Sequence, residues 1–188
     1  MLYTRDEILS NLEALSDELQ KLGIRGEMFL VGGAAMALAY NRERTTKDLY
    51  AVFEPNMVIY EAAKRVAKAR RLEPDWLNDA VKGFMPGPDP EAKTVLNLPG
   101  LSVSVASPRY LFALKALASR EDRDIDDLQT LYRLCGFASV DEAIEYVERV
   151  YSGRPVEARV AFVLRESLGG DTSSEEGSTE YLRRGRHP

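Results

Sequence analysis

Two glycines and a later acid are the residues whose types and spacing point most directly to chemistry. Gly32 and Gly33 follow a short apolar run, and Thr46 and Asp48 follow a polar, basic loop. A Gly-Gly turn between a strand and a helix lets backbone N–H groups approach a phosphate, and the helix N-terminus adds a favourable dipole. An acid on the neighbouring strand can hold Mg²⁺ there, because Mg²⁺ prefers oxygen ligands and few protein groups. The pattern therefore indicates a site for phosphate and magnesium. The same residues would also occur if Gly32-Gly33 formed only a turn and Asp48 were only a solvated acid.

Lys115 and Asp127 are two further candidates on segments with helical spacing. Lys115 has apolar neighbours one turn away, including Leu111, so its amine either extends to water or points into a cleft towards a triphosphate. Asp127 lies at the edge of an apolar stripe that contains Leu131. It either complements the helix dipole in the first turn or acts in catalysis, as a metal ligand or by activating an acceptor hydroxyl. For Asp124 we favour helix capping.

Basic residues offer further contacts for phosphate. Arg44 and Lys82 are candidate phosphate-binding residues, although such residues are more often solvated surface charges. The run of five cations between Lys64 and Arg71 lies on a predicted helix. It either binds an RNA backbone, where each neutralised phosphate adds salt-sensitive affinity, or forms a solvated helix face.

Composition narrows the class of chemistry. The chain has 188 residues, with 25 Lys+Arg, 30 Asp+Glu and a formal net charge of −5. Cys135 is the single cysteine and His187 the single histidine, which disfavours disulfides, histidine-based catalysis and most transition-metal sites. No apolar run reaches the length of a membrane helix, so we predict a cytoplasmic protein without a membrane partner. The shortage of histidine points to carboxylate and magnesium chemistry.

The scaffold that must position these residues is predicted to be mixed α/β. Thr4 and Glu7 form a capping-box pattern, and Pro99-Gly100 separates two strand-like runs as in a hairpin. Periodicity and turn residues predict the following helices and strands. The helices are 4–22, 34–40, 55–71, 76–84, 107–119, 124–135, 140–151 and 156–168, and the strands are 28–31, 47–53, 94–98 and 101–106.

We predict one domain with three parts. Residues 1–106 form an α/β core, residues 107–168 form a C-terminal helical part of the same domain, and residues 169–188 form a disordered tail. The tail is rich in Gly, Ser, Thr and Glu and too polar to bury much surface.

Several motifs together resemble a known family. Gly32-Gly33, the spacer and Thr46-x-Asp48 resemble the signature of the nucleotidyltransferase superfamily. Residues 76–84 (WLNDAVKGF), 106–115 (ASPRYLFALK) and 123–128 (RDIDDL) look like the AbiEii-like toxin nucleotidyltransferases, which include the MenT toxins. The resemblance extends from about Gly26 to Gly153, most of the chain before the tail.

The resemblance implies a nucleotidyltransferase-like mixed sheet flanked by helices, with a C-terminal helical cluster. It implies transfer of a nucleotidyl group from a nucleoside triphosphate to an acceptor hydroxyl, at the 3′ end of tRNA, with Mg²⁺. It also implies a toxin with a cognate antitoxin protein as partner. The residues that would carry the reaction are Gly32, Gly33, Thr46, Asp48, Lys115 and Asp127, with Asp48 and Asp127 as metal ligands.

Tyr50 departs from the family pattern. Members commonly have a second acid two residues after the first, and a tyrosine supplies no second carboxylate. Because strand side chains alternate, Asp48 and Tyr50 share one face, whereas Leu49, Ala51 and Phe53 share the other. Either one metal suffices, another acid substitutes, or activity is lost. Two alternatives follow: a binding module of the same fold without catalysis, and a transferase that adenylylates a protein.

Overall fold

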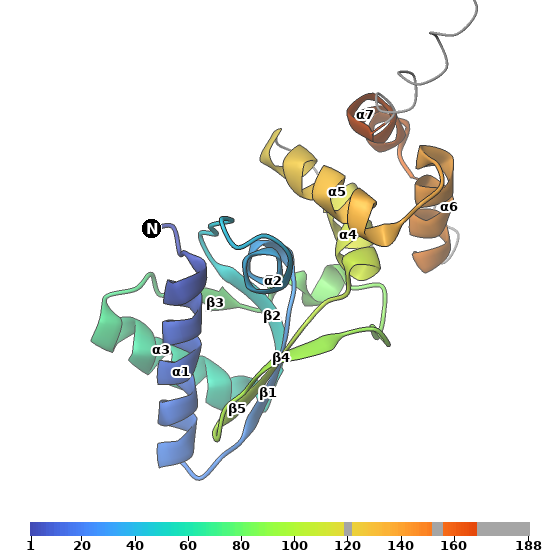
Figure 1. The fold of residues 1–188 in the computed structure, drawn as a ribbon. Helices are drawn as coiled ribbons and strands as arrows, with labels where there is room; N and C mark the ends of the chain where they lie inside the picture. Colours follow the sequence, from blue (N-terminus) through green and yellow to red (C-terminus); the bar gives the residue numbers. More distant parts are fainter. Residues whose placement is uncertain (119–121, 152–155, 169–188) are drawn as a thin grey trace, which may run out of the picture. The chain divides into compact units, whose positions relative to one another are not determined.

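The computed structural model describes residues 1–118, 122–151 and 156–168. It confirms the mixed α/β class, with a five-stranded mixed sheet flanked by helices (Figure 1). Two compact units divide the chain, Met1–Lys115 and Ala116–Pro188. The tail predicted at residues 169–188 lies outside the described residues.

The sheet belongs to the first unit and has the order β3-β2-β1-β5-β4. β1 is antiparallel to β2 and parallel to β5, and β3 is parallel to β2. β4 and β5 form the predicted antiparallel hairpin around Pro99-Gly100. The strands are β1 (Gly26–Leu30), β2 (Leu49–Glu54), β3 (Leu77–Asn78), β4 (Lys93–Asn97) and β5 (Leu101–Val105).

Most predicted helices form, with small changes at their ends. The capping box is present at the first helix, where the Thr4 side chain accepts from the Glu7 backbone and Glu7 accepts from Thr4 N at 2.8 Å. In the first unit the helical segments are α1 (Arg5–Lys21), α2 (Gly32–Ala35), the π-helical η1 (Met36–Tyr40), α3 (Asn56–Arg70) and the 3₁₀-helical η2 (Ala80–Phe84). α4 (Pro108–Ala118) runs across the boundary, and the second unit contains α5 (Asp122–Cys135), α6 (Val140–Val150) and α7 (Ala158–Leu168).

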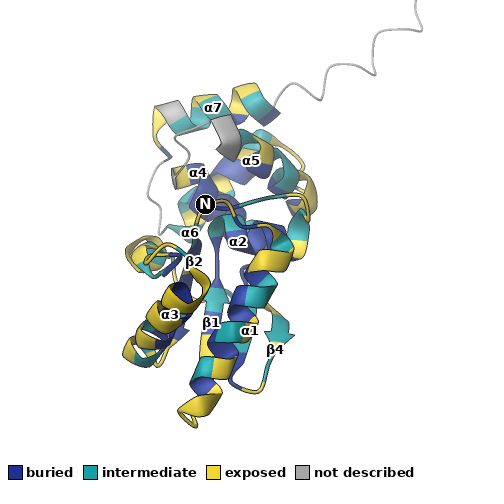
Figure 2. Cartoon of the chain, turned by 90° about the vertical axis from the view of Figure 1, so that its left-hand side faces the viewer, coloured by how far each residue is buried: buried dark blue, intermediate teal, exposed yellow. Residues whose placement is uncertain are grey.

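α1 and α3 pack against each other and cover one face of the sheet (Figure 1). A Cβ added at Gly26 of β1 would lie 2.8 Å from Ile59 Cδ1 of α3 and 3.2 Å from Leu19 Cδ1 of α1, so both helices contact the strand. Figure 2 shows that each helix carries an exposed stripe and a buried one. The buried residues of this layer include Ile8, Leu12, Leu15, Leu19, Met28, Leu30, Ile59, Ala62 and Val66.

The helix predicted over residues 76–84 is wrong in its first half. Leu77–Asn78 forms β3, and only Ala80–Phe84 is helical. Leu49 N donates to Trp76 O at 2.7 Å, which starts the parallel pairing with β2. The Trp76 side chain is fully buried and its Nε1 donates to Ala63 O at 3.1 Å. The backbone hydrogen-bonding groups of Leu77–Asn78 pair with β2, which is distant in sequence. The periodicity of residues 76–84 alone cannot predict such a pairing.

Three helices of the second unit share a small apolar core. α7 contacts both α5 and α6, and Gln129 Nε2 donates to Ser167 O at 3.0 Å. Gly136 ends α5 in the left-handed region at φ 64°, as its position after the helix predicts. The buried residues of this core include Leu128, Leu131, Ala143, Ile144, Val147, Leu164 and Leu168.

Candidate functional site

The chain leaves β1 directly into the Gly-Gly segment at one end of the sheet. Gly32 has φ +63°, a left-handed conformation that favours glycine. Both glycines are helical residues of α2, whereas the sequence predicted a turn before a helix that starts at Ala34. A Cβ at Gly33 would lie 2.6 Å from Thr46 Oγ1 and 2.9 Å from Thr46 Cβ. Glycine therefore lets α2 lie directly against the loop that carries Thr46.

Thr46 is fixed by its backbone and its side chain. Tyr3 N donates to Thr46 O at 2.7 Å, and Thr46 N donates back to Tyr3 O at 3.1 Å. The Thr46 hydroxyl is buried and donates to the backbone oxygen of Asp48 at 2.9 Å. This hydrogen bond fixes the conformation of the loop that places Asp48 at the start of β2.

Asp48 lies in a bend immediately before β2, which starts at Leu49 and not at the predicted Lys47, so its sharing a face with Tyr50 stays a prediction. Leu49, Ala51 and Phe53 are buried on the opposite face, whereas Tyr50 is 36% exposed. Tyr50 lies near Asp48, because the Asp48 charge adds to burial in raising the pKa of the Tyr50 hydroxyl.

Asn78 of β3 donates from its Nδ2 to Asp75 O at 3.4 Å and accepts at its Oδ1 from Ala80 N at 3.2 Å. It lies in register with Tyr50, because β3 runs beside β2. Sequence reasoning did not predict this neighbour of Tyr50, because strand pairing is not local. Asp79, the next residue, has a local structural role: it accepts from Tyr60 Oη at 2.7 Å and from Asn56 Nδ2 at 3.1 Å.

Burial favours the protonated form of Asp48 and so raises its pKa, and the nearby negative charge of Asp75 adds to the effect. The polar side chains of Tyr50 and Asn78 and the charge of Lys47 act in the opposite direction without cancelling it. Burial and the Asp48 charge also raise the pKa of the Tyr50 hydroxyl, so it stays protonated at neutral pH.

The donor set fits one magnesium ion better than two. Within residues 1–118, 122–151 and 156–168, no group of three or more His, Cys, Asp and Glu is arranged to hold a metal ion. Mg²⁺ is often held by one or two carboxylates plus substrate phosphates. The half-buried carboxylate of Asp48 could serve as one of these ligands. Tyr50 offers only a hydroxyl, so this strand does not supply a two-ion centre.

The two remaining catalytic candidates are buried. Lys115, on α4 at the end of the first unit, is 8% exposed, so its side chain does not extend freely into water. Asp127 is 2% exposed on α5 and belongs to the second unit, so its pairing with Asp48 stays a prediction.

The two candidate phosphate-binding residues lie on the surface of the first unit. Arg44 is half-buried and its Nη1 donates to Thr45 O at 2.8 Å. Lys82 is exposed on η2, and its charge contributes to lowering the pKa of Asp79. Their roles as phosphate contacts stay predictions.

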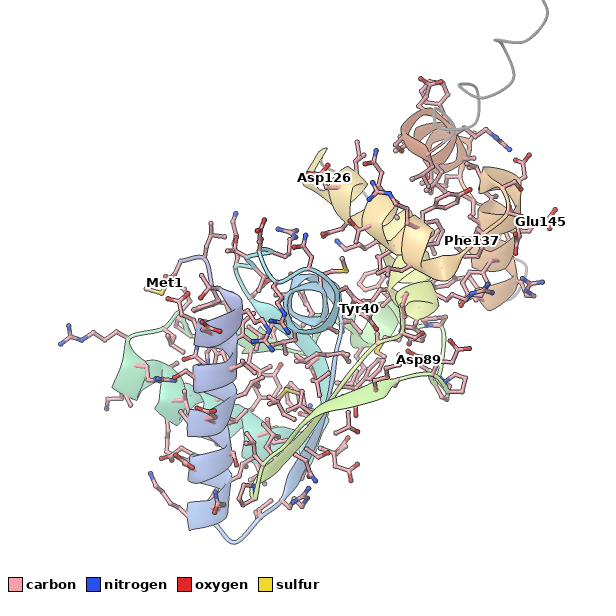
Figure 3. All side chains as sticks on the ribbon, viewed as in Figure 1. Met1, Tyr40, Asp89, Asp126, Phe137 and Glu145 are labelled. Atoms are coloured by element: carbon pink, nitrogen blue, oxygen red, sulfur yellow. The ribbon has the colours of Figure 1, made fainter. Side chains whose placement is uncertain are left out.

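Two side chains that sequence reasoning missed anchor the start of α4. Tyr40 Oη donates to Ala106 O at 2.8 Å, and Asp89 accepts from Ser107 N at 2.6 Å and Ser107 Oγ at 3.0 Å; Figure 3 labels Tyr40 and Asp89. Ala106 N also donates to Leu30 O at 3.0 Å. α4 therefore starts at the same end of the sheet as α2, since β1 and β5 are parallel neighbours.

Much of the basic run on α3 is engaged within the protein. Arg65 Nε donates to Glu18 Oε2 at 2.8 Å, and Arg70 donates to Ser10 and Asn11 of α1. Lys64 pairs with Glu61 at 2.8 Å. These contacts join α3 to α1 or lie along α3. At least part of the basic run therefore stabilises the packing of the two helices and is not only a solvated face.

A shallow hollow of about 490 Å³ lies on the other face of the sheet, and its lining contains none of the predicted site residues. Glu27 and Glu54 are direct partners across β1 and β2 there, beside the hydroxyls of Thr94, Ser102 and Ser104. This lining has no cation to bind phosphate. The cluster around Asp48 is therefore the better candidate site.

None of the helices in the described part of the chain combines the length and apolar character that crossing a lipid bilayer needs. No protein-family model and no curated protein matches the chain.

Proposed function

We propose that the protein is a nucleotidyltransferase that uses a nucleoside triphosphate. The observation that supports this most directly is the convergence of Gly33, Thr46 and Asp48 at the end of β1. The virtual Cβ of Gly33 meets Thr46 Oγ1 at 2.6 Å, and Thr46 Oγ1 donates to Asp48 O at 2.9 Å. These residues are separated in sequence and drawn together by the fold, as the resemblance to nucleotidyltransferases requires.

The reaction we infer is attack by an acceptor hydroxyl on the α-phosphorus of the triphosphate. A new P–O bond forms, the bond from the α-phosphorus to its bridging oxygen breaks, and pyrophosphate leaves. Backbone N–H groups at Gly32 and Gly33 bind phosphate oxygens, and Lys115 neutralises charge on the triphosphate. Asp127 either completes the metal site or activates the acceptor hydroxyl and takes up its proton.

Mg²⁺ is the proposed cofactor, held by Asp48 and Asp127, and it would neutralise charge that develops on the phosphate oxygens. The half-buried Asp48 supports this role, because a divalent cation would stabilise its carboxylate against the desolvation that raises its pKa. Arg44 and Lys82 are proposed contacts for the phosphates or the acceptor.

The proposed acceptor is the 3′ end of tRNA, and the proposed biological role is that of a toxin controlled by an antitoxin protein. Such a role places the protein in the cytoplasm. These proposals derive from the resemblance of residues 76–84, 106–115 and 123–128 to AbiEii-like toxins.

The test is transfer of nucleotide labelled at the α-phosphate to tRNA in the presence of Mg²⁺. Asp48→Ala should abolish transfer, whereas Glu43→Gln, an exposed acid in the same loop, should leave it intact. Asp127→Asn should reduce transfer strongly, and Asp126→Asn, its exposed neighbour, should not. Undiminished transfer by Asp48→Ala would remove the basis for this site.

A second candidate is a binding module of the same fold that has lost catalysis, and Tyr50 favours it, because a tyrosine supplies no second carboxylate on β2. Tyr50→Asp distinguishes the two. Transfer that appears only in this variant would show that the natural chain binds without catalysing. Transfer to a protein in place of tRNA would instead indicate the protein-modifying alternative.

A further inference from the structure

The segment of residues 85–92 is tied to the first turn of α4 by side chains from both sides. Asp89 accepts hydrogen bonds from Ser107 N at 2.6 Å and from Ser107 Oγ at 3.0 Å. In the opposite direction, Tyr110 Oη donates to Gly87 O at 2.7 Å. Ser107 Oγ also accepts from Tyr110 N at 3.3 Å, so one hydroxyl caps the helix and donates to Asp89. The position at which α4 starts therefore depends on this segment.

Asp89 is suited to hold a helix in place. It brings a carboxylate to a helix N-terminus, where a negative charge is favourable. Hydrogen bonds that an ionised carboxylate accepts are roughly twice as strong as those between neutral groups. Pro88 and Pro90 flank Asp89 and restrict the backbone on either side of it. The aspartate is therefore presented to Ser107 from a stiff backbone.

The same turn of α4 is connected to the proposed phosphate site. Ala106, the residue before Ser107, donates from its N to Leu30 O at 3.0 Å. Leu30 is the last residue of β1, two residues before Gly32. Tyr40 Oη, at the end of the helical stretch that begins at Gly32, donates to Ala106 O at 2.8 Å. The elements on both sides of the Gly-Gly segment therefore bond to the residue that leads into α4.

Lys115 lies on this helix, eight residues after Ser107, and belongs to the first unit. Eight residues of α-helix extend about 12 Å, so a shift or tilt at the start of α4 moves the lysine with it. Lys115 is 8% exposed, so its side chain has little room to compensate. A displacement of about 1 Å in a group that binds substrate can reduce the rate about 100-fold.

We propose that Asp89 is a positioning residue for the proposed reaction and acts through Lys115. By holding the first turn of α4 beside the end of β1, Asp89 keeps the ammonium group of Lys115 within reach of the triphosphate. This inference rests on the proposed function, because it needs a lysine that binds the triphosphate. Asp89 itself does not contact the nucleotide.

The experiment measures binding of each of the four nucleoside triphosphates, labelled at the α-phosphate, to the full chain with Mg²⁺ by equilibrium dialysis. Asp89→Asn is made in the wild-type chain and in a Lys115→Met chain. Tyr110→Phe removes the second tie between the segment and α4 and keeps the aromatic ring. Glu91→Gln is the matched control, an exposed acid in the same segment. The fluorescence of the single tryptophan during urea unfolding checks that each variant folds, and transfer to tRNA is measured with the same proteins.

We expect Asp89→Asn and Tyr110→Phe each to raise the dissociation constant of the nucleotide about tenfold in the wild-type chain, and Glu91→Gln to leave it unchanged. In the Lys115→Met chain neither substitution should raise it further, because the group through which they act is gone. A purely structural role would weaken binding by the same factor in both chains. Where Asp89→Asn does not fold, Tyr110→Phe decides by the same comparison.

Two results would overturn the positioning role and leave the proposed function standing, when the wild-type chain binds nucleotide and labels tRNA. One is an equal loss of binding in the wild-type and Lys115→Met chains, and the other is unchanged binding by folded variants. A wild-type chain that neither binds nucleotide nor labels tRNA overturns the proposed function, and this inference with it.

Discussion

Gly33→Ala tests the close approach on which the site is built. The added methyl carbon would lie 2.6 Å from Thr46 Oγ1 and 2.9 Å from Thr46 Cβ, closer than non-bonded carbon and oxygen atoms tolerate. Thr46 cannot move away easily, since its backbone exchanges two hydrogen bonds with Tyr3. The methyl group must therefore displace the threonine side chain or shift α2.

The structure sets the sign and the approximate size of the effect. Replacing glycine by alanine within a helix alone stabilises by roughly 0.5–1 kcal/mol. Overpacking costs about 1–3 kcal/mol, and loss of the Thr46–Asp48 hydrogen bond costs about 1 kcal/mol more. We expect Gly33→Ala to lower the free energy of unfolding by about 1–3 kcal/mol.

Urea unfolding followed by tryptophan fluorescence is the appropriate assay, because Trp76 is the only tryptophan and is fully buried in the first unit. Gly83→Ala is the matched control: nothing lies within 4 Å of its added Cβ, so we expect a change within about 0.5 kcal/mol. Thr46→Ala should reduce the penalty at Gly33, since it removes the closest atom. A stabilising Gly33→Ala would refute the contact.

Three other substitutions test the scaffold and the charge of the site. Gly100→Ala would place its Cβ 2.2 Å from Ser16 O, a backbone atom, and we expect a loss of about 3 kcal/mol or more in urea unfolding; a neutral result would contradict this packing. Arg70→Ala, which removes the bonds from α3 to α1, should cost about 1 kcal/mol. Lys68→Ala, on the same helical turn and without a bond among the described residues, should cost less. Burial raises the folded pKa of Asp48, so the stability that its protonated form contributes is present below its ordinary pKa and is lost as pH rises through the raised one. Asp48→Asn should therefore gain stability relative to wild type as pH rises from acid towards neutral, and a constant difference would refute the shift.

Local signals predicted most of the fold. The capping box of Thr4 and Glu7 and the Pro99-Gly100 turn each depend on residues close in sequence, and both form as predicted. β3 was missed because its formation depends on pairing with Leu49 and Tyr50. A two-residue strand has too short a pattern to be distinguished from a helical turn by periodicity.

The candidate site was predictable where it follows strand alternation. That rule placed Tyr50 on the face of β2 opposite to Leu49, Ala51 and Phe53, and these three are buried whereas Tyr50 is 36% exposed. The pairing of Asn78 with Tyr50 and the packing of Gly33 on Thr46 were not predictable, since both arise where the chain folds back on itself. The spacing of residues along a loop does not specify which atoms meet when the loop closes.

The tyrosine at position 50 limits which metal chemistry this end of the sheet can support. A second carboxylate there would add negative charge and a metal ligand, whereas a hydroxyl whose pKa is raised by burial stays protonated at neutral pH and adds neither. The strand therefore attracts a second cation less than a pair of acids would. Any metal chemistry on this strand depends on the single carboxylate of Asp48, so we expect Asp48→Ala to remove metal-dependent activity completely, where a site with two acids on the strand would retain one ligand.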